Sequence, residues 1–253
     1  MRLTFLGTGT SKGIPEIGCT CPTCLSTDKH DKRLRVSALI ETNDTRILID
    51  CGPDFRIQML NIPFRRIDGV LLTHEHYDHT GGIDDLRPFA IFGDIDIFTD
   101  KLTHQHLRER LPYFFQEKLY PGVPRLLFHT IEPYRSFNIK EVEITPLQVM
   151  HGKLPILGFR IGNLGFITDM TDALEETFEQ LLGIDTLVIG ALRQRPHATH
   201  QTIGEAIEVA RKVEAHEVYL IHMNHEAGLH AENDSKLPQH VHLAYDGLTI
   251  EIE

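Results

Sequence analysis

The chain has 253 residues, of which 41% are hydrophobic and 24% charged, and its formal net charge is −11. This composition excludes a disordered chain, the length suffices for a full hydrophobic core, and no apolar run approaches the roughly 20 residues of a membrane helix. The acidic balance disfavours a protein that binds nucleic-acid phosphates. Residues 1–13 lack the apolar core of a secretory signal, so we expect a cytoplasmic protein.

Short segments rich in Ile, Val, Leu, Phe and Thr are typical of β-strands and recur along the chain. Between them lie a few amphipathic segments with helical spacing. This alternation predicts an α/β protein in which two sheets share one core, with helices outside, in a single domain of residues 1–253. In chain order the predicted strands are Leu3–Leu6, Val36–Thr42, Arg46–Asp50, Gly69–Leu72, Ile95–Phe98, Val142–Gln148, Leu157–Ile161, Leu164–Thr168, Thr186–Ile189 and Glu217–Ile221.

Three helices are predicted from their capping residues and apolar stripes. The first covers His104–Phe115, although Pro112 weakens its end. The second covers Ala173–Leu182 and has Asp172 as its N-cap. The third follows Thr202 and covers residues 203–213.

Three of the four cysteines lie close together in a loop rich in glycine and proline. Cys19, Cys21 and Cys24 form a C-x-C-x-x-C motif within residues 18–24. Three thiolates on such a loop suit three corners of a tetrahedral zinc site, whose fourth ligand, expected to be a histidine, must come from elsewhere. The alternative is a set of reduced thiols or a redox pair. Cys51 follows an apolar strand and is expected to be a small buried residue.

Sixteen residues are histidines, and the densest group directly follows a predicted strand. His74 and His76 are two residues apart, so their rings point the same way in an extended chain. Asp78 and His79 follow at once, and two glycines after them free the backbone to begin a helix. The pattern is not the H-E-x-x-H zinc motif, because position 78 is Asp. Two histidines followed by an Asp-His pair favour a site for two adjacent metal ions. The alternative interpretation, a surface loop with scattered histidines, explains the pattern less well.

Further histidine and aspartate residues stand singly after later strands. His151, Asp169 and His222 each lie one to three positions past a predicted strand. Taken singly, each could be an ordinary surface or core residue. Together with the histidine-rich segment, they indicate that several strands bring their carboxyl ends to one cleft.

The segment T-H-x-H-x-D-H-x-G-G at residues 73–82 resembles the metallo-β-lactamase superfamily. His151, Asp169 and His222 follow in the family's order, and the resemblance extends from residues 3–10 to residues 245–247. It implies a four-layer αββα sandwich with a two-metal site at one edge. The implied ligands are His74, His76 and His151 for one metal ion, Asp78, His79 and His222 for the other, and Asp169 as a bridge between them.

The resemblance also assigns residues that support this site. Asp50 matches the family's early aspartate and is implied to orient a ligand without binding metal. Asp78 is implied to accept a proton in addition to its role as a ligand. The donor set does not fix the metal, and Zn or Mn are expected.

Within the superfamily, the chain is most similar to the PhnP-type cyclic phosphodiesterases. One shared feature is the cysteine motif, and another is His225, three residues after His222. The resemblance implies that His225 completes a structural zinc site with the three cysteines. It also implies that His200 acts near the leaving group, with His197 as a competing candidate. The expected function is therefore hydrolysis of a small, cyclic phosphodiester, although the loop 193–200 differs from the family pattern and leaves the substrate open.

Other functions of this superfamily remain as alternatives. One is a nuclease similar to RNase Z, although the chain has no obvious basic arm and its net charge of −11 disfavours polyanion binding. Hydrolysis at carbon, of a lactone, thioester or β-lactam, is a second. A non-catalytic ligand-binding or accessory protein of cofactor biosynthesis is a third. The expected partner is a small molecule, and no association with a membrane is expected. Family members suggest a homodimer.

Overall fold

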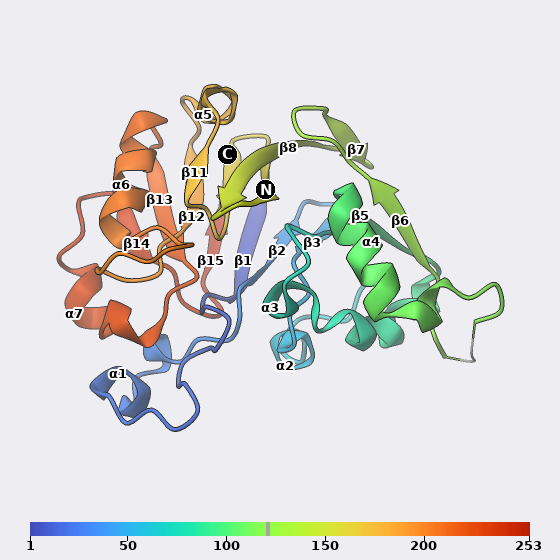
Figure 1. The fold of residues 1–253 in the computed structure, drawn as a ribbon, viewed down its shortest axis with the longest axis horizontal. Helices are drawn as coiled ribbons and strands as arrows, with labels where there is room; N and C mark the ends of the chain where they lie inside the picture. Colours follow the sequence, from blue (N-terminus) through green and yellow to red (C-terminus); the bar gives the residue numbers. More distant parts are fainter. Residues whose placement is uncertain (120–121) are drawn as a thin grey trace.

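A computed structural model describes residues 1–119 and 122–253 of the chain, and it contains two β-sheets packed face to face (Figure 1). The first sheet has the strand order β15-β1-β2-β3-β4-β5-β6. Its strands are β1 (Arg2–Gly7), β2 (Ser37–Glu41), β3 (Arg46–Ile49), β4 (Gly69–Leu71), β5 (Ile95–Thr99), β6 (Leu126–Thr130) and β15 (Thr249–Glu251).

The second sheet has the order β11-β8-β9-β10-β12-β13-β14, and β7 pairs with β8 outside this path. All of its strands come from the second half of the chain, whereas those of the first sheet come mainly from the first half. Its strands are β7 (Phe137–Ile139), β8 (Val142–His151), β9 (Leu154–Ile161), β10 (Leu164–Ile167), β11 (Asp172–Ala173), β12 (Thr186–Gly190), β13 (Glu217–Ile221) and β14 (Val241–Leu243).

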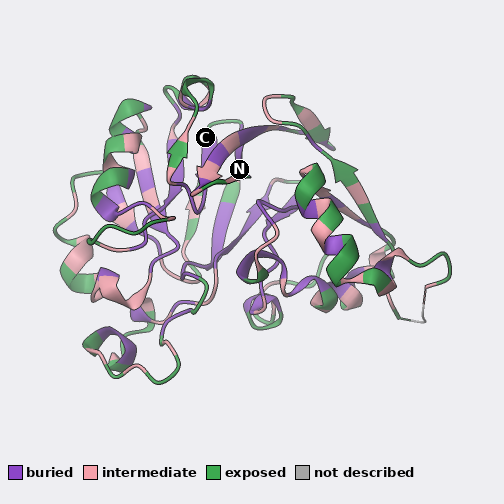
Figure 2. Ribbon diagram, in the orientation of Figure 1, coloured by how far each residue is buried: buried purple, intermediate pink, exposed green. Residues whose placement is uncertain are grey.

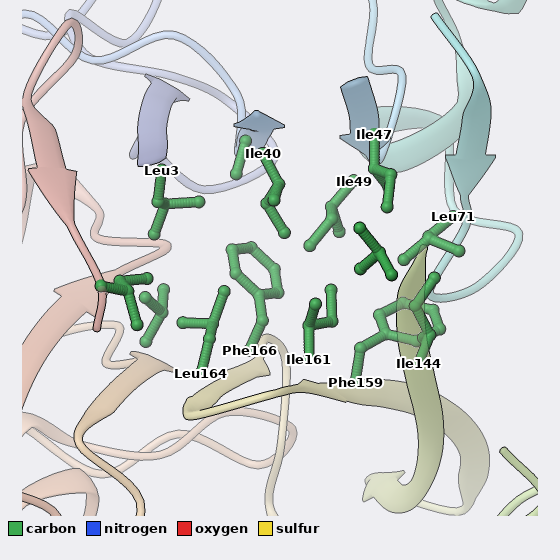
Figure 3. Close-up of a cluster of buried hydrophobic side chains, with 14 of the residues drawn as sticks. Leu3, Ile40, Ile47, Ile49, Leu71, Ile144, Phe159, Ile161, Leu164 and Phe166 are labelled. Carbon is green, nitrogen blue, oxygen red and sulfur yellow. The ribbon is translucent and has the colours of Figure 1, made fainter. Parts of the chain in front are cut away.

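The main core lies between the two sheets, where apolar side chains of both inner faces interdigitate (Figure 3). Helices cover the outer faces, so central strands such as β3 are buried on both sides and carry continuous apolar runs (Figure 2). The four layers predicted from the sequence are confirmed. The first sheet contributes Leu3, Ile40, Ile47, Ile49 and Leu71 to the core, and the second contributes Ile144, Phe159, Ile161, Leu164 and Phe166.

Short helices connect the strands and form the outer layers. The α-helices are α1 (Pro22–Leu25), α2 (Phe55–Met59), α3 (Tyr77–Thr80), α4 (Lys101–Arg110), α5 (Glu175–Leu181), α6 (Ile203–Lys212) and α7 (His230–Asp234). The 3₁₀ helices are η1 (Lys29–Asp31), η2 (Ile83–Phe92), η3 (Pro112–Phe115) and η4 (His225–Ala227).

The predicted cap of α6 is confirmed, because the Thr202 side chain accepts a hydrogen bond from the Glu205 N–H and Glu205 reaches back to Thr202. The predicted cap at Asp172 is wrong. Residues 172–173 form strand β11 against β8, the Asp172 carboxylate accepts from the Ala173 N–H, and α5 starts only after Leu174. Pairing with a sheet edge has overridden the local capping pattern.

The predicted helix His104–Phe115 is also wrong at both ends. It starts earlier because the Asp100 side chain accepts hydrogen bonds from the N–H groups of Leu102 and Thr103. It ends at Arg110, and Pro112 then begins the separate 3₁₀ helix η3. In the part of the chain that the structure describes, no helix is both long and apolar enough to span a membrane.

Candidate metal centre

Polar residues follow the carboxyl ends of strands from both sheets. Strands β3 and β4 are parallel neighbours, as are β10, β12 and β13, so within each sheet these carboxyl ends lie at the same edge. Asp50 follows β3, Asp169 follows β10 and His222 follows β13, and their φ angles are 59°, 52° and 58°. Non-glycine residues in this left-handed region are uncommon and concentrate at functional sites.

Four of the predicted ligands form a first cluster. His74, His76, His151 and Asp169 each offer an atom, and these atoms all lie within 4.8 Å of one another. His74 follows β4, His76 is the N-cap of α3, and His151 ends β8. The cluster thus joins the histidine-rich segment of the first sheet to two strand ends of the second.

The second cluster consists of Asp78, His79, Asp169 and His222, again within 4.8 Å of one another. Asp78 and His79 lie in the single turn of α3, and all four residues are buried. Asp169 belongs to both clusters. The structure therefore brings together all seven residues that the resemblance implied as ligands, with Asp169 between the two groups.

Unsatisfied ring nitrogens support cations at this position. The Nε2 atoms of His79 and His222 are buried and make no aligned hydrogen bond to any described residue, although carboxylate oxygens lie 3.1–3.5 Å away. Buried polar atoms without partners are costly and need an explanation. Imidazole nitrogens and carboxylates are ligands of Zn, Mn and similar divalent metals, so the donor set fits a pair of such ions.

Three of the histidines are oriented through their other ring nitrogen, whereas Nδ1 of His222 has no hydrogen-bond partner among the described residues. His79 Nδ1 lies 2.7 Å from Asp50 Oδ2, and His74 Nδ1 lies 3.0 Å from the Thr73 hydroxyl. Asp50 also accepts hydrogen bonds from the Thr73 N–H and hydroxyl. His151 Nδ1 lies 2.7 Å from the Thr199 carbonyl oxygen. Such contacts orient ligands and raise their basicity. The sequence indicated Asp50 but carried no signal for the carbonyl of Thr199.

Replacing Asp50 with Asn is expected to weaken metal binding by about 10–100-fold, because the amide cannot hold His79 and Thr73 as the carboxylate does. The affinity is measured by competition with a chromophoric chelator. Asp44→Asn, in an exposed turn, is the matched control. An affinity unchanged in Asp50→Asn would contradict the orienting role.

The buried charges of the site influence one another strongly. Burial raises the pKa of Asp78 and Asp169, but His79 and His222 lower both values more, so each carboxylate has a pKa below its usual range. Burial opposes a charge on His79, yet Asp78 and the other two carboxylates around it raise its pKa well above the usual value. Two ionised carboxylates in a buried pocket favour a bound cation.

His200 lies beside both clusters, on the loop between β12 and α6. Its ring centroid is 4.7 Å from that of His151 and 5.0 Å from that of His222, and its Nδ1 is 3.9 Å from Asp169 Oδ2. Burial, followed by the neighbouring His222, lowers the pKa of His200 to about 3, so its ring is neutral at pH 7. His197 is exposed, with its ring 5.2 Å from that of His200. Of the two candidates, His200 is the one in contact with the clusters.

A separate group of sulfur and nitrogen atoms lies at the N-terminal loop. Cys19, Cys21, Cys24 and His225 offer atoms within 4.8 Å of one another, and Sγ of Cys19 and Cys21 lie 3.1 and 3.2 Å from His225 Nδ1. The other ring nitrogen of His225 is 3.5 Å from Glu16. The four cysteines are free thiols. Three thiols and one imidazole, with no further ligand among the described residues, fit a closed tetrahedral zinc site.

Cys21 and Cys24 differ in acidity. Burial opposes ionisation of Cys21, but hydrogen bonds from the Cys24 N–H and from His225 lower the pKa of Cys21 to about 6. Burial raises the pKa of Cys24 to about 11. Since zinc binds thiolates, binding at this site would release protons.

Comparison with known proteins agrees with this architecture. Residues 45–223 match the family model of the Beta-lactamase superfamily domain. The whole chain is 45% identical, over 255 aligned residues, to an octanoyltransferase of Porphyromonas gingivalis (strain ATCC BAA-308 / W83), of which it covers 52%. It is 25% identical over 148 residues to a ribonuclease Z of Azobacteroides pseudotrichonymphae genomovar. CFP2, an alignment with 55% of this chain and 48% of that enzyme. The chain thus spans about half the length of these curated relatives.

A solved structure covers nearly the entire chain. The crystal structure of a diphosphatase from the PhnP family is 34% identical, has a TM-score of 0.92, and aligns with 99% of this chain and 97% of its own. This similarity and the family match together establish that the chain has the hydrolase fold of that family. The chain belongs to the metallo-β-lactamase superfamily and lies near its PhnP type.

Proposed function

We propose that this protein is a metal-dependent phosphodiesterase that hydrolyses a small, cyclic phosphodiester. The observation that carries the proposal is the pair of ligand clusters that share Asp169 and lie beside His200. Two adjacent metal sites are typical of enzymes that cleave phosphate esters. Support also comes from the similar diphosphatase of the PhnP family, which is 34% identical over nearly the whole chain.

Each residue of the site has a proposed task. Divalent ions held by the two clusters would supply an activated water and positive charge for the transition state at phosphorus. Asp169 holds the two clusters together, and Asp78 is both a ligand and a proton acceptor. His200 directs a ring N–H toward the substrate phosphate or its leaving oxygen, a position consistent with its contacts to His151 and His222.

Replacing His200 with Ala is expected to lower kcat about 10²-fold, because the variant loses a neutral ring N–H that donates a hydrogen bond to the charge developing in the transition state. Metal content should stay unchanged, since His200 belongs to neither ligand cluster. Steady-state kinetics and elemental analysis of the same sample measure the two quantities. His197→Ala is the matched control on the same loop. Loss of metal in His200→Ala would show that the residue is a ligand.

The proposal is tested with bis(p-nitrophenyl) phosphate and a panel of cyclic and linear phosphodiesters, with Zn²⁺ or Mn²⁺ added. We expect turnover of the diesters, with cyclic ones preferred. A diphosphate ester belongs in the panel, because the similar PhnP-family protein is a diphosphatase. A protein that binds its metals but turns over no phosphate compound would contradict the proposal and favour a ligand-binding role.

A second candidate is hydrolysis of an acyl thioester. It is favoured by one observation, that the whole chain is 45% identical to about half of an octanoyltransferase. The two clusters would polarise a carbonyl as readily as a phosphate oxygen. Octanoyl thioesters assayed beside the phosphodiesters separate the two candidates. Thioester hydrolysis exceeding diester hydrolysis in kcat/KM would replace the first proposal with the second.

A further inference from the structure

The loop that carries His200 has two contacts with the metal clusters. The Thr199 carbonyl oxygen lies 2.7 Å from His151 Nδ1, and the adjacent His200 ring packs against His151 and His222. The position of these backbone and ring atoms therefore affects both a ligand and a proposed catalytic group. The contacts that hold this loop in place therefore also determine the positions of the His151 and His200 rings.

The base of the loop is closed by backbone hydrogen bonds. The Leu192 N–H donates to the Gln201 carbonyl over 2.9 Å, and the Gln201 N–H donates to the Met170 carbonyl over 3.1 Å. The Asn224 N–H donates to the Leu192 carbonyl over 3.0 Å. Between Leu192 and Gln201, residues 194–198 are exposed, so the tip of the loop depends on side-chain contacts.

Those contacts converge on Glu226. Arg193 and Arg195 each donate to a different carboxylate oxygen of Glu226. Arg193 also donates to the loop's own carbonyls at Arg195 and Pro196, at 3.2 Å each. The Arg193 guanidinium therefore binds both the backbone at the tip of the loop and the carboxylate of Glu226. We name the three charged residues, Arg193, Arg195 and Glu226, the Glu226 clamp.

Glu226 is held in turn by the segment that carries the cysteine-site histidine. It directly follows His225 in η4, and its N–H donates to the Asn224 side chain over 2.9 Å. His225 is within 3.2 Å of the sulfurs of Cys19 and Cys21. The clamp is therefore the side-chain link between the Cys₃His group and the loop of His200.

We propose that Glu226 is a positioning residue, which holds Thr199 and His200 against the catalytic clusters through the clamp and makes their position depend on the Cys₃His site. This deepens the proposed function and rests on it for the role of His200. Ion pairs that solvent can reach add little to global stability, and in the clamp Arg195 is exposed while Arg193 and Glu226 are partly exposed. A small displacement of a positioned group nevertheless costs up to about 10²-fold in rate. The clamp should therefore matter for the site far more than for the fold.

The test compares Glu226→Ala and Glu226→Gln with Glu232→Ala, an exposed glutamate on the neighbouring α7. Trypsin provides a readout independent of activity, because it can cut after Arg193, whereas the bond after Arg195 precedes Pro196 and resists it. We expect Glu226→Ala to accelerate this cut about tenfold or more, since proteolysis follows the population of the open loop. Glu226→Gln keeps one acceptor oxygen and should lie between Glu226→Ala and the wild type. The melting temperature should change by no more than about 2 °C.

Two functional readouts complete the test. In Glu226→Ala, kcat for a phosphodiester should fall about 10–100-fold with little change in KM, and affinity for added Mn²⁺ should fall several-fold because His151 loses its orienting carbonyl. Cys21→Ser should accelerate the same tryptic cut, and adding Glu226→Ala to it should produce no further increase.

Glu226→Ala matching Glu232→Ala in cleavage and Mn²⁺ affinity would overturn the proposal, as would faster cleavage without any change in kcat or affinity. Additive effects of Cys21→Ser and Glu226→Ala on cleavage would overturn the dependence on the Cys₃His site. If the wild type hydrolyses no phosphodiester, the proposed function fails. The rate of tryptic cleavage and the affinity for Mn²⁺ then still decide the role of Glu226.

Discussion

Replacing Asp169 with Ala is expected to lower phosphodiesterase turnover by at least about 10⁴-fold, which corresponds to roughly 5.5 kcal/mol of transition-state free energy. Among the residues that the structure describes, Asp169 is the one that contributes to both candidate ligand clusters, and it is almost fully buried. Its removal takes a negative charge and a ligand from both sites at once. The polarisation and the activation of water that a metal pair would supply there are worth several kcal/mol and would be lost together.

The measurement is steady-state turnover of a phosphodiester, with metal content determined on the same sample. Asp172→Ala is the matched control, because Asp172 lies three residues away but is exposed and contacts the backbone of Ala173. We expect Asp169→Ala to lose the metal ions of both catalytic clusters and to keep the zinc ion at the cysteines. Substantial activity with a full metal content in Asp169→Ala would contradict the bridging role.

Replacing Cys21 with Ser is expected to remove one zinc ion per chain and to lower the free energy of unfolding by about 3–5 kcal/mol, since metal binding contributes to folding free energy. For a chain of this size the melting temperature should fall by about 10 °C. The sulfur of Cys21 accepts from the Cys24 N–H and faces His225 across 3.2 Å, so its loss opens the site.

Thermal unfolding with zinc analysis tests this expectation, and Thr20→Ala is the control in the same loop. Thr20 is exposed and lies between Cys19 and Cys21. A metal content unchanged in Cys21→Ser, or thiols that react freely in the wild-type protein, would contradict a zinc site. Unchanged stability despite loss of zinc would show that the site is not structural.

The candidate metal centre could largely be predicted because four of its candidate ligands lie within residues 74–79. His74, His76, Asp78 and His79 all lie on the short segment that leads from β4 into α3, so their proximity follows from local geometry. Asp169, by contrast, is an isolated residue, and only the strand ends and the family resemblance indicated it. The left-handed backbone conformation of Asp169 cannot be predicted from the residue type alone, because tertiary contacts impose it.

The errors in the helices have a common physical origin. At Asp172 the local capping pattern is sound, but pairing with Met150 of β8 takes these residues into a sheet. At Asp100 the true cap lies before the predicted start of α4. The Glu226 clamp could not be foreseen either, since Arg193 and Glu226 are 33 residues apart and meet only through the fold. Local patterns thus predict ligands within one segment, whereas contacts between segments require the structure.

The dependence of turnover on bound metal tests the two-metal phosphodiesterase most directly. Protein stripped of its exchangeable metals is titrated with Zn²⁺ or Mn²⁺, and phosphodiester turnover is measured together with the metal content of each sample. We predict about three metal ions per chain at saturation, one of which resists mild chelation, and turnover that rises as the other two bind. Full turnover with a single metal at the catalytic clusters, or no turnover with all sites filled, would contradict the account.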